Sequence, residues 1–537
     1  MRLRQLSLRL RRIAFESPDL PQTLGAAAAN PLALLNSSDA FAAIPFATEL
    51  DQNVEALAAL WRHQDGLISR RIEAGGRRFA IVFLKGTVDE ARLEANCIRP
   101  LVNTQLALNE ATLEEVGDRV LTADGWQRAH LLGDGIRMIT RGFPLLFVDG
   151  EAHALAIKAP ERPHRAITNP PNEAVVRGPH DGFNEALETN VALLRARLRT
   201  PLLHFEEFTL GRLSQTRVKI AYIDGLARPD LVAELKSRIE RIEIDAVLES
   251  NYVQELIEET PYTIFPTVWY SERPDAVAGQ LLEGRIAILT DGSPAALVMP
   301  TTFWALLQAN EDYYDVFWYA SFVRLMRIVA SVIAVILPGL FVAVLTYTPE
   351  ALPAPLLLQI AASSENAPLP TTSEVLLMLI AFDVLQEAGI RLPRPVGQTI
   401  GIVGGLFVGQ MSVQAGLVTP TIVIVAALST ISTFLIPHYS LGNSARLLRY
   451  FVTAAASFAG LFGLLGAVLA ISGHLAWLRS LGQPYLWPTG QADLSFVGDT
   501  LVRMPWWRMW PRPRSSRLWG SRREAFPLRP GDERDDS

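Results

Sequence analysis

The stretch SFVRLMRIVASVIAVILPGLFVAVLTY, residues 321–347, decides what kind of protein this chain is. After Arg327 it has about twenty predominantly apolar residues, the length that a helix needs to cross the hydrocarbon core of a bilayer. Pro338 lies inside the stretch and predicts a kink, because proline removes a backbone hydrogen bond from the helix. The stretch therefore predicts a transmembrane helix that opens a membrane region.

Three further apolar stretches indicate additional spans. They are PVGQTIGIVGGLFVGQMSV (395–413), LVTPTIVIVAALSTISTFLI (417–436) and RYFVTAAASFAGLFGLLGAVLAI (449–471). Together these stretches are too long, too apolar and too numerous for the core of a soluble domain. The sequence predicts an all-α polytopic membrane domain over residues 316–478 with about four spans.

A fifth segment, EVLLMLIAFDVLQEAGI at residues 374–390, is shorter and carries charge. Asp383, Gln386 and Glu387 lie on one face at helical spacing. One interpretation is an amphipathic or re-entrant helix at the membrane interface. The other is a helix that turns Asp383 and Glu387 toward water inside an oligomer.

The arginines bear on orientation, because they favour the cytosolic side of a membrane. Arg324 and Arg327 begin the first span, and the tail is rich in arginine, so both ends favour the cytosol. Two cytosolic ends need an even number of spans, which fits if residues 374–390 do not cross. If they cross, the loops at Arg391 and Arg446 lie inside and the tail outside, and the sequence leaves both topologies open.

The glycines of GIVGGLFVGQ, residues 401–410, invite comparison with a phosphate-binding loop. The lysine and Ser/Thr that such a loop requires are missing from their positions. Gly401, Gly405 and Gly409 are four residues apart and share one helix face, so we expect another helix to approach closely there.

Several polar residues lie within or beside the apolar spans. Because unpaired polar groups are costly in lipid, we expect them either to line an ion path or to form hydrogen bonds between packed helices. They are Gln398, Gln410, Gln414, Ser429 and Thr433.

The region before the spans contains an internal repeat. FAIVFLKG (79–86) and VKIAYIDG (218–225) are strand-like runs that end in a glycine turn and precede a helical pattern. Each unit later carries an Asp-Gly pair between two apolar runs, at 149–150 and 291–292, which predicts a hairpin. We therefore expect an α/β soluble N-terminal region of two similar subdomains before the membrane domain.

The predicted organisation follows from these patterns. Residues 1–54 are expected to form a flexible arm, 55–160 and 215–315 the two cytosolic α/β subdomains, and 161–214 a connecting helical segment. Residues 479–537 are expected to be a basic, Trp-rich interfacial and cytosolic tail, because tryptophan and arginine favour the membrane surface.

Composition and motifs argue against several functions. The 537 residues carry a formal net charge of −6, without the concentrated basic face of a nucleic-acid binder. The single cysteine, Cys97, cannot form an intramolecular disulfide. The sequence contains no GxxxxGK[ST], HExxH or nucleophile-elbow motif, and its histidines lack metal-ligand spacing. We expect no enzyme activity, no catalytic residue, no metal site and no cofactor.

Long collinear stretches resemble the A subunit of the GerA-type spore germination receptors over about residues 55–515. They include SERPDAVAGQLLEGRIAILTDGSP (271–294), IPHYSLGNSARLLRY (436–450) and DTLVRMPWWRMWPRPR (499–514). Two departures are Leu379, where many members carry a carboxylate, and Gln386-Glu387, where many have Arg-Glu.

The resemblance implies a multi-pass protein of the spore inner membrane with a large cytosolic N-terminal region. It implies a transporter-like B subunit and a lipoprotein C subunit as partners, a homo-oligomer, and a role in passing nutrient sensing to ion release. An alternative within the family is an accessory A-like protein that acts with the dipicolinic-acid release channel. A membrane-anchored nucleotide sensor is a weaker alternative, because the phosphate motif is missing.

Overall fold

The computed structural model describes residues 44–61, 66–104, 111–123, 125–159, 170, 173, 175–364, 368–392, 404–406, 408–489 and 499–509. The described chain forms two compact units. The α/β unit comprises residues 44–258 and Val268–Pro300, and the helical unit comprises Glu259–Thr267 and Thr301–Met509.

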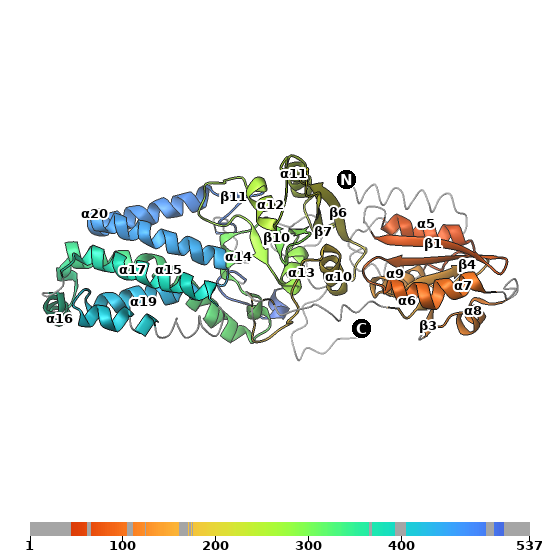
Figure 1. The fold of residues 1–537 in the computed structure, drawn as a ribbon, viewed down its shortest axis with the longest axis horizontal. Helices are drawn as coiled ribbons and strands as arrows, with labels where there is room; N and C mark the ends of the chain where they lie inside the picture. The colour runs from red at the N-terminus through yellow and green to blue at the C-terminus, as the bar shows by residue number, and fades with distance from the viewer. Residues whose placement is uncertain are drawn as a thin grey trace, which may run out of the picture. The chain divides into compact units, whose positions relative to one another are not determined.

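The α/β unit contains two five-stranded antiparallel sheets (Figure 1). The strands of the first sheet are β1 (Leu67–Ala74), β2 (Arg77–Leu84), β3 (Trp126–Ala129), β4 (Leu145–Val148) and β5 (Ala154–Ile157). Those of the second are β6 (Leu203–Leu210), β7 (Thr216–Ile223), β8 (Trp269–Ser271), β9 (Ile286–Thr290) and β10 (Ala296–Met299). The orders β1-β2-β4-β5-β3 and β6-β7-β9-β10-β8 are the same topology, which confirms two subdomains of similar build.

Helices cover both faces of the first sheet. They are α5 (Leu50–Leu60), α6 (Glu90–Leu93), the π-helix η1 (Glu94–Ile98), α7 (Arg99–Asn103), α8 (Leu113–Arg119) and α9 (Leu132–Thr140). Successive side chains of β2 point to opposite faces, so Ala80 and Val82 join α5 and α9 in one core, while Phe79 and Ile81 join η1, α7 and α8 in the other. Continuous apolar runs such as FAIVFL are therefore buried on both sides.

The second sheet has its own helices, α10 (Leu187–Arg197), α11 (Pro229–Glu240), α12 (Ser250–Ile257) and α13 (Pro274–Leu282). Helices α10 and α13 pack against each other and against the sheet, and α12 contacts both α11 and β10. The Asp-Gly pairs form the β4–β5 and β9–β10 turns, where Gly150 and Gly292 adopt positive φ angles. The two predicted hairpins are confirmed.

The predicted connecting segment 161–214 is wrong for its second half, because α10 and β6 belong to the second subdomain. Strand β6 pairs with β7 along its whole length, from Leu203 to Leu210. Its alternating sequence LHFEEFTL exposes part of one face, as an edge strand does, so it lacks the continuous apolar run that marked the buried strands.

The predicted arm 1–54 is also wrong for its last residues. Ile44, Phe46, Leu50 and Val54 are buried in the first core, and α5 begins at Leu50. Residues 1–43 lie outside the described part of the chain.

The repeat extends to asparagines that precede each sheet. Asn53 in α5 holds the backbone of Ala47 with both amide atoms, accepting at 2.8 Å and donating at 2.7 Å. Asn190 in α10 holds Asn184 in the same way, at 2.9 and 2.6 Å. Helices α5 and α10 are therefore equivalent elements of the two subdomains.

The hairpin aspartates repeat as well. Asp149 accepts from the backbone N–H of Leu50 at the start of α5, and Asp291 accepts from Leu187 at the start of α10, both at 3.2 Å. Side-chain and backbone donors hold the pKa of Asp149 below its ordinary value, first of all the hydrogen bond from Arg78. A carboxylate at a helix N-terminus is favourable because it accepts free N–H groups and interacts with the helix dipole.

The main elements of the helical unit are α14 (Phe303–Leu307), α15 (Phe317–Tyr347), α16 (Ala354–Ser364), α17 (Thr371–Arg391), α19 (Pro420–Phe434) and α20 (Tyr439–Trp477). A short β11–β12 ribbon follows at residues 479–484. Helix α15 packs against α17, α19 and α20, and continues through Pro338. The unit extends beyond the predicted 316–478 at both ends, so the described tail residues 479–489 and 499–509 are part of it.

Helix α20 is a hairpin of two arms that reverse at Ala459 and Gly460, where the backbone leaves helical geometry (Figure 1). Gly460 has a φ of 58°, a backbone angle that residues other than glycine rarely adopt. A Cβ atom added to Gly339 of α15 would lie 3.0 Å from Val452 and 3.2 Å from Leu464, so both arms meet α15 at one point. The prediction of a single span over 449–471 is therefore wrong, because a glycine-based reversal interrupts a run that is apolar throughout.

Two of the described helices are long and apolar enough to cross a membrane, by length and composition. They are α15, with a mean hydropathy of 2.8, and α20, with 2.1, when the two arms of α20 are counted together as one helix of 39 residues. The apolar helix α19 has 15 residues. Segment 374–390 is helical within α17, and residues 395–403 lie outside the described residues, so the number of spans stays a prediction.

Candidate functional site

A buried charge network joins three helices of the helical unit around Asp383. Arg449 of α20 is fully buried and forms an ion pair with the Asp383 carboxylate of α17. Tyr450 donates its hydroxyl to the same carboxylate at 2.5 Å, and Arg446 lies 3.8 Å from it. Arg449 also donates to Thr430 of α19 at 3.3 Å. The network ties α17, α19 and α20 together.

Charge within this network is unequal. Two arginines, Arg446 and Arg449, face the single carboxylate of Asp383. Among the described residues, the Nε atoms of both arginines and Oε1 of Gln386 are buried without a hydrogen-bond partner. Because the removal of one partner leaves the other charge buried and uncompensated, the network is sensitive to any change in its acid.

The other predicted site residues of α17 and α19 have local partners. Glu387 pairs with Arg391 one turn later at 2.8 Å, with both side chains exposed. Ser429 is buried and donates to the Ala334 carbonyl of α15 at 2.8 Å. Thr433 donates to the Ser429 carbonyl of its own helix at 3.2 Å.

The described glycines of the predicted stripe, Gly405 and Gly409, pack against other helices of the same chain. A Cβ atom added to Gly405 would lie 3.7 Å from Leu385, and one added to Gly409 would lie 3.5 Å from Val423. The tighter position is Gly404, which the stripe did not include, at 2.5 Å from the same Leu385. Gly401 and Gln398 lie outside the described residues. Gln410 and Gln414 are exposed within this single chain.

Sequence reasoning missed a second charge network at the start of α15. Asp312, which is buried, accepts from Arg327 at 2.7 Å and from Arg324 at 3.1 Å. Asp499 pairs with Arg324 at 3.6 Å and accepts from the Tyr313 hydroxyl at 2.9 Å. Arg324 and Arg327, which the sequence analysis used as signals of membrane orientation, are therefore paired with carboxylates within the fold. The signal in the sequence that could have indicated this pairing is Asp312, which lies shortly before the predicted span.

Glu374 was also missed as a structural carboxylate. It is buried, and it accepts from the backbone N–H of Thr419 at 2.9 Å, at the N-terminus of α19. The Thr-Pro pair at 419–420 is a helix-start signal in the sequence. The carboxylate that accepts from the Thr419 N–H could not be predicted, because Glu374 lies 45 residues away.

In the α/β unit, three ligand-type side chains meet although their sequence spacing did not suggest it. The carboxylates of Glu114 and Glu151 and the ring of His153 lie within 4.8 Å of one another. Arg128 pairs with Glu114 at 2.7 Å and Arg77 lies 3.7 Å from Glu151. The neighbouring guanidinium groups already balance the charge of the two carboxylates.

Glu173 is a second notable acid of the α/β unit. It accepts from the hydroxyl of Ser271 at 2.6 Å, beside the buried Arg273–Asp275 pair of the SERPDA stretch. Burial raises the pKa of Glu173 to about 7, although the hydrogen bond from Ser271 opposes this shift.

We expect Glu173→Gln to change the pH dependence of stability. A folded pKa above the ordinary 4.5 means that the folded protein retains a proton that the unfolded chain releases, so stability falls as pH rises from 4.5 to about 7. The variant should match the native protein near pH 4.5 and exceed its free energy of unfolding by about 1–3 kcal/mol at pH 8. Denaturant unfolding followed by tryptophan fluorescence at both pH values measures this, with exposed Glu240→Gln as control. An equal difference at both pH values would contradict the assignment.

The two units define a two-part class of protein, with a duplicated α/β region joined to apolar helices that buried charges hold together. The model of a family described as Bacillus/Clostridium GerA spore germination protein matches residues 55–515. The chain belongs to this GerA family, as the sequence resemblance predicted.

The chain is similar to germination proteins over most of their length. Spore germination protein KA of Bacillus subtilis (strain 168) is 37% identical over 452 residues, covering 84% of this chain and 83% of that protein. Spore germination protein GerLA of Bacillus cereus is 35% identical, with 80% and 87% covered. The uncharacterized membrane protein YfkQ of Bacillus subtilis (strain 168) is 38% identical, with 87% and 91% covered.

A solved structure also matches the N-terminal part. The crystal structure of the N-terminal domain of the A subunit of the Bacillus megaterium spore germinant receptor GerK3 is 31% identical. The match covers 48% of this chain and 97% of that chain, with a TM-score of 0.39.

Proposed function

We propose that this chain is the A-type membrane subunit of a spore germinant receptor, which oligomerises and transmits nutrient sensing to ion release. The observation that carries the proposal is the collinear match to germination proteins through both units, over residues 55–515. The proposed site is the spore inner membrane, with several spans and the α/β unit in the cytosol. Its proposed partners are transporter-like B and lipoprotein-like C subunits, and its role is not enzymatic.

The surface of the helical unit supports membrane insertion and assembly. Large apolar side chains are exposed along it, among them Phe322 of α15, Ile424 of α19 and Phe462 of α20. Apolar surface of this extent calls for lipid or another subunit. The proposal supplies both.

Exposed glutamines next to this surface support a polar path between copies. Gln410 and Gln414 are one turn apart and exposed within one chain, and an amide facing lipid is costly. In an oligomer they would face either neighbouring chains or water. Asp383, by contrast, is engaged by Arg449 inside the chain, and Ser429 by α15, so we assign these two to helix packing.

The proposal predicts that Gln410→Leu alters ion flux while leaving assembly intact. Spores that carry the variant together with the partner subunits should release ions on nutrient addition at a rate about tenfold below that of the native receptor, because an apolar side chain cannot replace the amide beside ions. Gln359→Leu, the same change at an exposed position of α16, is the matched control. Unchanged flux with normal assembly would remove Gln410 from the ion path.

The accessory alternative is a second proposal within the same family, because similarity to the family does not separate the two roles. Deletion of the gene separates the two roles. A receptor subunit is required for the response to its nutrient alone, whereas an accessory to the dipicolinic-acid channel is required for release under every trigger. Neighbouring genes for B and C subunits would support the receptor.

A further inference from the structure

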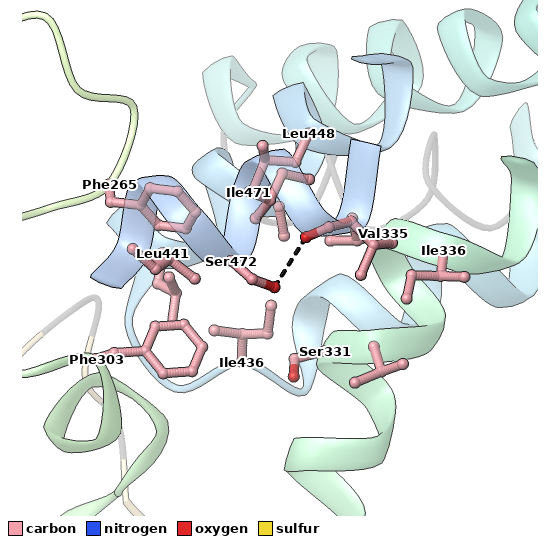
Figure 2. A pocket seen from close by; sticks show the side chains of 14 residues that line it. Phe265, Phe303, Ser331, Val335, Ile336, Ile436, Leu441, Leu448, Ile471 and Ser472 are labelled. Carbon is pink, nitrogen blue, oxygen red and sulfur yellow. Dashed lines mark hydrogen bonds between the residues drawn. The ribbon is translucent and has the colours of Figure 1, made fainter. Parts of the chain in front are cut away.

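The helical unit contains a partly open cavity of about 170 Å³ between α15, the segment before α20 and both arms of α20. Figure 2 shows the side chains that surround it, with Ser331, Val335 and Ile336 on one side and Leu448, Ile471 and Ser472 on another. The remaining lining residues are Phe265, Phe303, Val332, Ile436, Leu441, Ala445, Val468 and Leu475.

The wall offers almost no polar recognition. Its two hydroxyls already donate to carbonyls of their own helices, Ser331 to Ile328 at 2.7 Å and Ser472 to Val468 at 2.8 Å, the bond dashed in Figure 2. The other lining side chains are aliphatic or phenyl groups. A charged or strongly polar ligand would therefore lose its hydrogen bonds to water without replacement.

We propose that this cavity is a binding site for a small uncharged apolar molecule of about the size of benzene. A cavity of roughly 150 Å³ lined by aliphatic and phenyl side chains binds benzene in another protein, and the present pocket, although partly open, has a similar volume and lining. The volume corresponds to a small molecule rather than to a whole lipid chain, and the apolar lining offers no hydrogen-bond partners to amino acids or sugars. This goes beyond the proposed function, because it assigns a ligand site to this chain itself.

The position of the cavity gives its occupant a structural effect. Val335 of α15, Ala445 of the first arm and Ile471 of the second arm all contact the same space. A molecule that fills this space adds contacts to all three helices at once. It therefore stabilises the arrangement in which the hairpin is packed on α15, by binding that state in preference to any other.

Fluorobenzene binding to the full chain in lipid nanodiscs tests the site, observed by ¹⁹F saturation-transfer NMR. Ala445→Leu and Ser331→Leu fill the cavity from two different helices. If one of the two variants fails to fold, the other still tests the site. Ala470→Leu adds the same bulk at an exposed position of the second arm and is the matched control. Circular dichroism and melting temperature check that each variant is folded.

We expect saturable binding to the native chain and to Ala470→Leu. For both filling variants we expect the affinity to fall by a factor of about ten or more. A native chain that shows no saturable binding would overturn the proposal, as would equal affinity in a folded filling variant. Binding of long-chain alkanes without binding of fluorobenzene would also overturn it, because the occupant would then be a lipid chain.

Discussion

The variant Asp383→Leu should lose about 3–5 kcal/mol of stability in the helical unit, the cost typical of removing one partner from a buried ion pair. Arg449 is fully buried and Asp383 is its ion-pair partner, so the variant leaves a guanidinium without a counterion. Arg446 and the Tyr450 hydroxyl lose the same carboxylate. Unfolding by SDS in mixed micelles, followed by circular dichroism, measures the loss.

Two comparisons separate the charge from other effects of this change. Glu387→Leu, one turn further along α17, removes an exposed carboxylate and should cost at most about 1 kcal/mol. The double variant Asp383→Leu, Arg449→Met removes both charges and should recover part of the loss, with Arg446 limiting the recovery. Additive losses in the double variant would show that the pair is not coupled.

The variant Asp312→Leu should have a comparable or larger effect, of about 3–5 kcal/mol or more, since one carboxylate serves two arginines. Arg327 and Arg324 donate to its two oxygens at 2.7 and 3.1 Å. Both guanidinium groups are largely buried at the start of α15. Asp499 remains beside Arg324 but leaves Arg327 without compensation.

The effect of Asp312→Leu should also reach the C-terminal segment. Ser321 of α15 donates to the Arg503 carbonyl at 3.1 Å, so residues 499–509 dock beside the same network. Limited proteolysis should therefore cut this segment faster in the variant than in Glu350→Leu, which replaces an exposed glutamate of the same unit. Equal cutting and equal SDS stability in the two variants would contradict a central role for Asp312.

Local patterns predicted most of the fold, because they reflect local causes. The strand–glycine–helix runs and the Asp-Gly hairpins predicted the duplicated α/β build, and the apolar stretch 321–347 predicted α15. The edge strand β6 escaped prediction because one of its faces is partly exposed, so it has no continuous apolar run. The hairpin in α20 escaped because hydropathy is equal on both sides of Gly460, and the reversal depends on a backbone angle and on contact with α15.

The candidate site was predicted in part. Asp383 and Ser429 were singled out as polar groups in apolar helices, and each has a buried partner. Their partners could not be predicted, since Arg449 is 66 residues from Asp383 and Ala334 is 95 residues from Ser429. Among the described glycines of residues 401–410, Gly404, which is outside the predicted stripe, approaches its neighbour more closely than Gly405 does, a difference set by the rotation of one helix against α17.

The sequence by itself determined the family, the duplication and the apolar character of the C-terminal half, because residue order, turn chemistry and hydropathy depend only on near neighbours in the chain. The tertiary structure alone decided which charges neutralise one another, where α20 reverses and that α15 and the two arms of α20 line a common cavity. Those features depend on pairs of residues far apart in sequence, and packing geometry brings them together without leaving a local pattern.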